Sequence, residues 1–181
     1  MESSQHTHTP PGSASFLTPA RRRSLTGALA GLGVGAGLAF VFSAWIGPVA
    51  RETALALALF VPGAVVFVLV LAVAAGRFLT QAFDPFADAA SPSRYMAITQ
   101  RALSNSMEQG VIFATAGTAL VVAGGPEAGT LTAALAATYA VARLAFWLGY
   151  LHSMFGRAPG MAATLGINLV LVTAAAAAIL G

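Results

Sequence analysis

Five long apolar segments, separated by short polar breaks, constrain the fold of this 181-residue chain more than any other feature. Each has close to the roughly 20 residues that a helix needs to cross the hydrocarbon core of a bilayer. The segments cover approximately residues 25–47, 53–76, 98–123, 130–154 and 159–180. Charged residues make up 8% of the chain, against about 25% in a typical soluble domain. The sequence therefore predicts an all-α integral membrane protein with five transmembrane helices.

The charge and the cysteine count exclude several classes of function. The net charge of +3 comes from nine arginines and no lysine. These arginines are spread over the ends of the apolar segments and one candidate site, whereas nucleic-acid binding requires a basic patch. The chain has no cysteine, which excludes disulfides, thiolate metal sites and a cysteine nucleophile. We predict neither a nucleic-acid partner nor a metal site.

The distribution of arginine predicts how the chain is oriented in the membrane. Arg21, Arg22 and Arg23 precede the first segment, and the positive-inside rule places such a cluster in the cytoplasm. With five crossings, loops 77–97 and 152–158 also face the cytoplasm, and both contain further arginines. The alanine- and glycine-rich composition, with arginine but no lysine, is typical of a high-GC bacterium. We expect the bacterial inner membrane, with a cytoplasmic N-terminus.

The first apolar segment has two interpretations. Its flank, ARRRSLTG, resembles a twin-arginine export signal, which is cleaved after export. Its apolar run is longer than the roughly 7–15 residues of a typical signal core, and no good Ala-x-Ala cleavage site follows. We favour a retained transmembrane helix. Residues 1–24, which precede it, are rich in small polar residues and predict a disordered cytoplasmic tail.

Three glycines within the first segment, Gly27, Gly31 and Gly35, recur at four-residue intervals. Small residues in this pattern let helix backbones approach closely in lipid. The glycine stripe fits a contact between copies of the chain as well as packing against the chain's own helices. The sequence leaves both interpretations open.

One helical face of the third segment carries three polar side chains. Arg101, Asn105 and Glu108 are spaced by four and three residues, which brings them to one side of a helix. An ionisable group inside a membrane costs about 2.5–3.5 kcal/mol on insertion scales, so such groups usually face the bundle interior and have a function. This trio is the leading candidate for a functional site.

The fourth segment presents a matching polar and aromatic face. Spacings of four, three and four residues align Tyr139, Arg143, Phe146 and Tyr150. Arg143 lies deep in an apolar run and cannot lose its charge. Because Glu108 is the only carboxylate within the predicted transmembrane segments, we predict an Arg143–Glu108 ion pair, formed directly or bridged by a ligand. A pair that only fixes the register of the two helices is the alternative.

Arginines converge near the predicted cytoplasmic end of these two segments. Arg101 lies at the start of the third segment, and Arg157 follows the fourth. Their guanidinium groups repel one another unless an anion compensates, and one glutamate cannot neutralise them all. The implied partner is a small anionic molecule with many hydrogen-bonding groups.

The stretches RALSNSMEQ and YAVARLAFWLGYLHSMFGRAP together resemble the MAPEG family, the membrane-associated proteins of eicosanoid and glutathione metabolism. The shared pattern is Arg-x-x-x-Asn-x-x-Glu in one helix, followed in the next by Ala-Arg, an aromatic residue, Gly-Tyr and a further arginine. The resemblance covers about residues 54–181. It implies a MAPEG-like four-helix domain over residues 51–181. Residues 25–50 are then an extra N-terminal transmembrane helix.

The resemblance also implies a homotrimer that binds glutathione between neighbouring subunits near the cytoplasmic face. Arg157 matches the arginine that stabilises the glutathione thiolate in leukotriene C4 synthase-like members. Such a guanidinium lowers the pKa of a thiol, so more thiolate exists at neutral pH. The residues that the resemblance assigns to glutathione binding are Arg77, Arg101, Asn105, Glu108, Arg143 and Tyr150.

The function implied is that of a glutathione-dependent transferase or peroxidase of MAPEG type. Its thiolate attacks a lipophilic electrophile or a hydroperoxide. Phe146 departs from the family pattern, because several members have a tyrosine there whose hydroxyl contacts glutathione. A non-catalytic lipid-binding or scaffold protein on the same fold is therefore the alternative. A transporter is less well supported, since the segments show no inverted repeat.

Overall fold

The computed structural model describes residues 18–79 and 93–181, which form five α-helices and no strand. Every one of these helices is long and apolar enough to cross a membrane. The prediction of an all-α membrane bundle is confirmed. The helices are α1 (Pro19–Ile46), α2 (Arg51–Leu79), α3 (Arg94–Ala123), α4 (Glu127–His152) and α5 (Ala158–Leu180).

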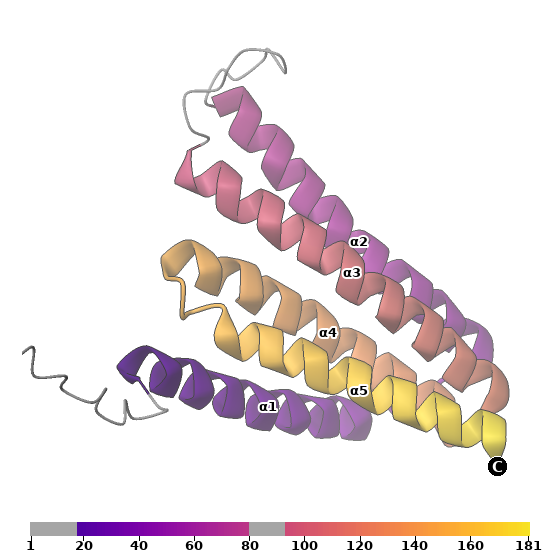
Figure 1. The fold of residues 1–181 in the computed structure, drawn as a ribbon. Coiled ribbons are helices and arrows are strands. Elements are labelled where there is room, and N and C mark those ends of the chain that lie inside the picture. Colours follow the sequence, from indigo (N-terminus) through magenta and orange to yellow (C-terminus); the bar gives the residue numbers. More distant parts are fainter. Residues whose placement is uncertain (1–17, 80–92) are drawn as a thin grey trace, which may run out of the picture.

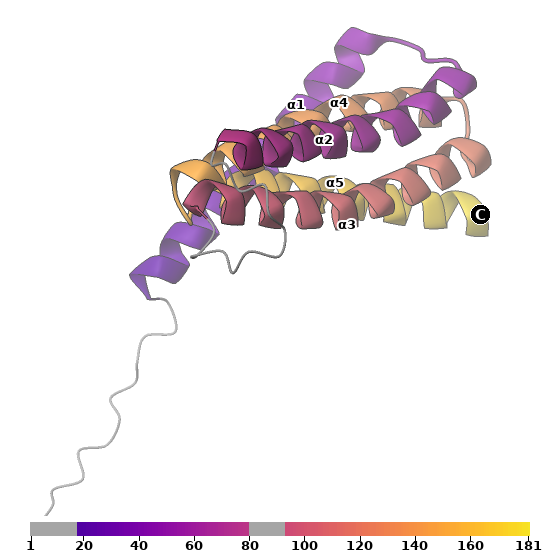
Figure 2. The same cartoon turned by 90° about the horizontal axis from the view of Figure 1, so that it is seen from above.

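Helices α2 to α5 form a bundle, and α1 lies against its flank (Figure 1). Both α2 and α5 pack against α3 and α4, and α3 also contacts α4. Helix α1 packs against α4 and α5 and crosses the bundle obliquely (Figure 2). The starts of α1, α3 and α5 lie at the same end of the molecule as the ends of α2 and α4. We call this the arginine-rich end, because it holds Arg21, Arg77, Arg94 and Arg157.

Helices α1 and α3 begin before the apolar segments that predicted them. The hydroxyl of Thr18 accepts a hydrogen bond from the backbone N–H of Arg21 over 3.3 Å, which caps the start of α1. Ser93 caps α3 in the same way, accepting from the backbone N–H of Met96 over 3.3 Å. Apolar patterning marks the part of a helix that crosses the membrane, whereas these polar caps extend the helix beyond it.

Two of the predictions fall partly outside the described residues. The predicted disordered tail, residues 1–24, is described from residue 18 onward, and residues 19–24 form the first turns of α1. The central part of loop 77–97 is the other case, because residues 80–92 are not described. The domain boundaries after residues 24 and 50 stay predictions.

Polar side chains bridge the helices inside the bundle. Asn168 of α5 donates from Nδ2 to the Oε1 of Gln109 on α3 over 2.8 Å, and to the carbonyl oxygen of the same residue over 3.1 Å. Trp147 of α4 donates from its indole nitrogen to the hydroxyl of Thr99 on α3 over 3.2 Å. Interhelical hydrogen bonds in membranes average about 0.6 kcal/mol, so these contacts contribute more to register than to stability.

The glycine stripe of the first segment packs against α5 of the same chain. Gly31 and Gly35 are buried, and the start of α5 lies directly against them. Contact within the chain is therefore the interpretation that the structure supports.

Candidate functional site

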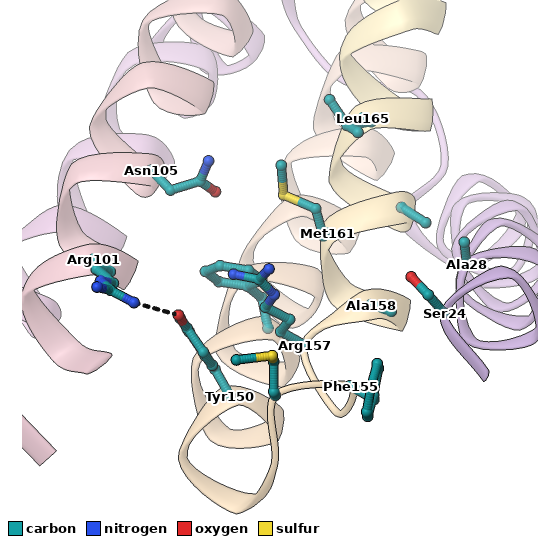
Figure 3. Close-up of a pocket in the computed structure, with 13 residues that line it drawn as sticks. Ser24, Ala28, Arg101, Asn105, Tyr150, Phe155, Arg157, Ala158, Met161 and Leu165 are labelled. Atoms are coloured by element: carbon teal, nitrogen blue, oxygen red, sulfur yellow. Dashed lines mark hydrogen bonds between the residues drawn. The ribbon is translucent and has the colours of Figure 1, made fainter. Parts of the chain in front are cut away.

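A pocket of about 500 Å³ opens at the arginine-rich end, between α3 on one side and α4 and α5 on the other (Figure 3). We call it the arginine pocket. Helix α3 supplies Arg101 and Asn105 on one side, and α1 supplies Ser24 and Ala28 on the other. The remaining lining comes from α4, α5 and the turn between them: Phe146, Tyr150, Met154, Phe155, Arg157, Ala158, Met161, Ala162 and Leu165.

Tyr150 lies between two arginines in this pocket (Figure 3). Arg101 donates from Nη1 to the Tyr150 hydroxyl over 3.5 Å, at the long limit of a hydrogen bond. The guanidinium carbon of Arg157 lies 4.8 Å from the centroid of the Tyr150 ring, within range of a cation–π interaction. The ring is buried and packs against Phe146, with the two ring centroids 6.0 Å apart. Tyr150 therefore contacts one guanidinium group through its hydroxyl and a second through its ring face.

Neither of these guanidinium groups has a carboxylate partner among the described residues. Arg101 and Arg157 are both exposed. Two such charges beside an apolar bundle favour an anionic ligand, and the planar fork of arginine donors suits a carboxylate. Arg94 has a structural role instead, because its Nη2 lies 3.3 and 3.4 Å from the carbonyl oxygens of the last two residues of α4.

The side-chain oxygen of Asn105 is buried and accepts no hydrogen bond from the described residues. Asn105 lies one helical turn beyond Arg101, and its side chain points toward the pocket (Figure 3). A buried acceptor without a partner costs about 1–3 kcal/mol. A ligand N–H group would remove that cost. The pocket thus combines two cationic donors with one neutral acceptor, which suits a ligand that carries both carboxylate and amide groups.

A second, more open hollow of about 500 Å³ runs along the outer face of α3. We call it the α3 groove, and it is lined by Ala97, Gln100, Arg101, Ser104, Asn105 and Glu108. Arg101 and Asn105 border both hollows. Glu108 is exposed in the groove. The predicted trio does share one face of a helix, but Glu108 faces outward and does not line the arginine pocket.

Arg143 does not pair directly with Glu108, so the direct form of the predicted ion pair is wrong within one chain. Arg143 donates from Nε and Nη2 to the hydroxyl of Ser106, over 3.1 and 2.6 Å. Its guanidinium carbon lies 4.3 Å from the centroid of the Phe146 ring. Ser106 and Glu108 are two residues apart on α3 and point to nearly opposite sides, because each residue turns a helix by about 100°. An arginine that faces Ser106 is turned away from Glu108.

The sequence profile of one known family matches residues 53–177, which cover nearly all of α2 to α5. The chain belongs to the MAPEG family. This family includes glutathione-related transferases and proteins of lipid metabolism. No curated protein and no solved structure matches the chain significantly. The MAPEG match contains every predicted site residue, whereas α1 lies outside it.

Two of the predicted site residues in the MAPEG domain line neither hollow. Arg143 is 1% exposed and contacts the wall of the arginine pocket through Phe146. Arg77 lies in the last turn of α2, at the arginine-rich end. Their assignment to glutathione binding stays a prediction. Within residues 18–79 and 93–181, no three histidine, aspartate or glutamate side chains are placed to hold a metal ion.

Ser106 and the apolar half of the arginine pocket were not predicted from the sequence. The sequence did contain an indication of Ser106, because a buried guanidinium such as that of Arg143 requires a hydrogen-bond acceptor on a neighbouring helix of the MAPEG domain. Met161 and Leu165, one turn apart on α5, line the apolar side of the pocket. Their spacing is that of any lipid-facing helix, so it gave no signal for a binding site.

Proposed function

We propose that this MAPEG protein is a membrane-embedded, glutathione-dependent transferase or peroxidase. The placement of Tyr150 between Arg101 and Arg157 carries the proposal, because it leaves two guanidinium groups facing a pocket without a carboxylate from the described residues. Glutathione has two carboxylates and two amide N–H groups. The arginines and the unsatisfied oxygen of Asn105 are complementary to these groups.

In this proposal the two hollows bind different parts of one glutathione molecule. Arg101 and Asn105 border both hollows, so they bind the central part of the peptide and a carboxylate. Glu108, exposed in the α3 groove, suits the α-ammonium group. The cysteine end then lies in the arginine pocket, where Arg157 and the apolar residues are.

Arg157 activates the thiol. A free thiol has a pKa near 8.5, and a guanidinium close to the sulfur lowers that pKa by favouring the charged form. The thiol proton passes to solvent. The thiolate sulfur then forms a bond to an electrophilic carbon, and either a leaving group departs or a proton is added to the product. With a hydroperoxide, the sulfur takes up the terminal oxygen, the O–O bond breaks and an alcohol forms. A second glutathione then converts the sulfenic acid to glutathione disulfide and water.

A homotrimer completes the site in this proposal. Glu108 lies midway along α3 and is exposed in the single chain. A charged side chain facing lipid at that depth costs about 2.5–3.5 kcal/mol on insertion scales. A neighbouring subunit over the α3 groove removes this cost and closes the ligand site from the outside. Closed cyclic symmetry lets all three copies bury the same face in this way.

A non-catalytic lipid-binding or scaffold protein is the second candidate function, and Phe146 favours it. The Phe146 side chain lines the arginine pocket and provides no hydroxyl for a thiol ligand. Together with Met161 and Leu165, it makes an apolar surface that suits a lipid chain with an anionic head group. Thiolate formation separates the two candidates, because the second predicts bound lipid and no thiolate.

Calorimetry with glutathione on the purified, intact oligomer tests ligand binding. Arg101→Ala removes a hydrogen bond between charged groups, worth about 1.5–3 kcal/mol, so Kd rises about 10- to 150-fold. Arg51→Ala is the matched control, because Arg51 begins α2 at the opposite end of the molecule. We expect its Kd to stay within about twofold of the wild-type value. An intact wild-type oligomer that binds no glutathione would contradict the proposed function.

A further inference from the structure

Helix α1 lies outside the residues that match the MAPEG family, yet it contributes to the arginine pocket. Ser24 and Ala28, one helical turn apart, line the side of the pocket opposite Arg101 (Figure 3). Met161 and Leu165 of α5 lie between these two sides. The additional helix is therefore part of the candidate site as well as a membrane-crossing segment.

Close backbone contact fixes α1 in this position. A Cβ atom added at Gly31 would lie 2.1 Å from the carbonyl oxygen of Pro159 on α5. One added at Gly35 would lie 3.0 Å from the Cβ of Ala163. Gly27, next to Ala28, continues the same contact toward the pocket. The glycines bring the two helices together, and this contact sets the distance of Ala28 from α5.

The pocket is polar at the α3 side, whereas the α1 and α5 side carries mostly apolar groups beside the Ser24 hydroxyl and the Arg157 guanidinium. Arg101 and Asn105 form its polar side, whereas Ala28, Met161 and Leu165 provide methyl, thioether and isobutyl groups. The volume of about 500 Å³ lies within the roughly 300–1,000 Å³ of typical small-molecule sites. A ligand that fills it has a polar head at α3 and an apolar body that extends toward α1.

We propose that α1 forms the far wall of the subsite for the apolar part of the substrate, and that Ala28 limits the size of the group accepted there. The proposal rests on the proposed function, because it takes the polar head to be glutathione. It assigns to α1 a role in specificity: the substrates are electrophiles with an extended apolar chain attached to the reacting carbon. A bulkier side chain at position 28 shortens the chain that the site accepts.

Cysteine labelling tests the proposal cleanly, because the chain has no cysteine of its own. The test compares Ala28→Cys with Leu29→Cys, a control at the same depth whose native side chain is exposed and does not line the pocket. Each variant is labelled with a maleimide in the presence of S-methylglutathione or S-decylglutathione. Calorimetry on the same samples reports whether each conjugate binds.

We expect S-decylglutathione to slow labelling of Ala28→Cys at least tenfold, while S-methylglutathione changes the labelling rate less than twofold. Neither compound should protect Leu29→Cys.

The possible results separate this proposal from the proposed function. If both conjugates bind but neither protects Ala28→Cys, α1 is not a wall of the subsite, while glutathione binding stands. Equal protection by both conjugates also overturns the proposal, because the apolar chain is then not what reaches α1. If neither conjugate binds, the proposed function fails and this proposal fails with it.

A steric variant gives an independent measure. Ala28→Phe should raise the Kd of S-decylglutathione at least tenfold and leave that of S-methylglutathione within twofold. Leu29→Phe is the matched control and should change neither value. A Kd for S-decylglutathione that is the same in Ala28→Phe and wild type would overturn the proposed size limit.

Discussion

At the residue scale, Arg143 is a charged side chain that is almost completely buried, so its neighbours must stabilise the charge. Its side chain is buried between α3 and α4, and its charge is balanced by no carboxylate among the described residues. The Ser106 hydroxyl and the face of the Phe146 ring are the groups that contact its guanidinium. Nη1 has no hydrogen-bond partner within the described residues. Because arginine stays charged inside proteins, we expect the contact with Ser106 to stabilise this helix pair.

Ser106→Ala therefore destabilises the bundle. The substitution leaves Arg143 with no hydrogen-bond acceptor from the described residues, and a hydrogen bond to a charged group is worth about 1.5–3 kcal/mol. We expect the free energy of unfolding to fall by about that amount, measured by denaturant titration in detergent. Thr115→Ala is the matched control, because Thr115 is exposed on the same helix, lines neither hollow and donates only to carbonyl oxygens of α3. It should change the free energy by less than about 0.5 kcal/mol. Equal effects of the two substitutions would contradict the role given to Ser106.

The sequence predicted which residues share a helical face better than it predicted which side chains they contact. The spacing of Tyr139, Arg143, Phe146 and Tyr150 correctly indicated one helical face, and all four side chains are buried. Charge complementarity favoured Glu108 as the partner of Arg143. The rotation of α3 presents a hydroxyl to Arg143 instead, and that rotation depends on how four helices pack. Spacing along one helix contains no information about it.

At the scale of elements, the contact between α1 and α5 depends on three glycines that face α5. Gly31 allows the carbonyl of Pro159 to touch the α1 backbone. Gly33, two residues away, has no atom within 4 Å of an added Cβ. The same helix thus carries one glycine that packing requires and one that packing does not. This difference provides a matched pair of substitutions.

Gly31→Ala should loosen α1 from the bundle. The added methyl group meets backbone atoms that cannot rotate away, and overpacking of this kind costs about 1–3 kcal/mol. The melting temperature of the purified protein in detergent, followed by circular dichroism, reports the loss. Gly33→Ala adds the same methyl group into open space and should leave the melting temperature unchanged or slightly raised. A lower melting temperature in Gly33→Ala than in Gly31→Ala would contradict the packing described here.

The elements themselves were predictable because lipid imposes a length and a composition on each crossing. All five apolar segments became helices. Their starts were less predictable, since the caps at Thr18 and Ser93 lie in polar stretches that hydropathy does not mark. The contribution of α1 to the arginine pocket was also not predictable, because the glycine stripe fitted two different partners.

At the scale of the whole molecule, the two hollows that contain the candidate site lie at one end and on one outer face. The arginine pocket opens at the arginine-rich end, and the α3 groove runs along a face that a single chain leaves uncovered. Large apolar side chains are exposed elsewhere along the helices, among them Phe40, Phe60 and Phe67. Lipid solvates these apolar side chains but does not solvate the charge of Glu108. We therefore infer that the chain assembles with its α3 groove facing another copy.

Native mass spectrometry from detergent measures this assembly directly. We expect a species of three times the 18.2 kDa chain mass. Glu108→Lys places a positive charge beside Arg101 in the groove, so it should shift the population toward single chains. Glu127→Lys, at the opposite end of the molecule, is the matched control and should leave the trimer intact. A wild-type protein that binds glutathione as a single chain would contradict the proposed assembly.

Formation of the glutathione thiolate, measured by ultraviolet difference absorbance, tests the central proposal most directly. In the proposed mechanism the guanidinium of Arg157 lowers the pKa of the bound thiol, so we expect the thiolate of wild-type complexes to appear with a midpoint well below the value of about 8.5 for a free thiol. Arg157→Ala should bind glutathione and move the midpoint back toward that value, each pKa unit corresponding to about 1.4 kcal/mol. A wild-type complex that holds glutathione with the midpoint of the free thiol would contradict the proposed chemistry and favour the lipid-binding alternative.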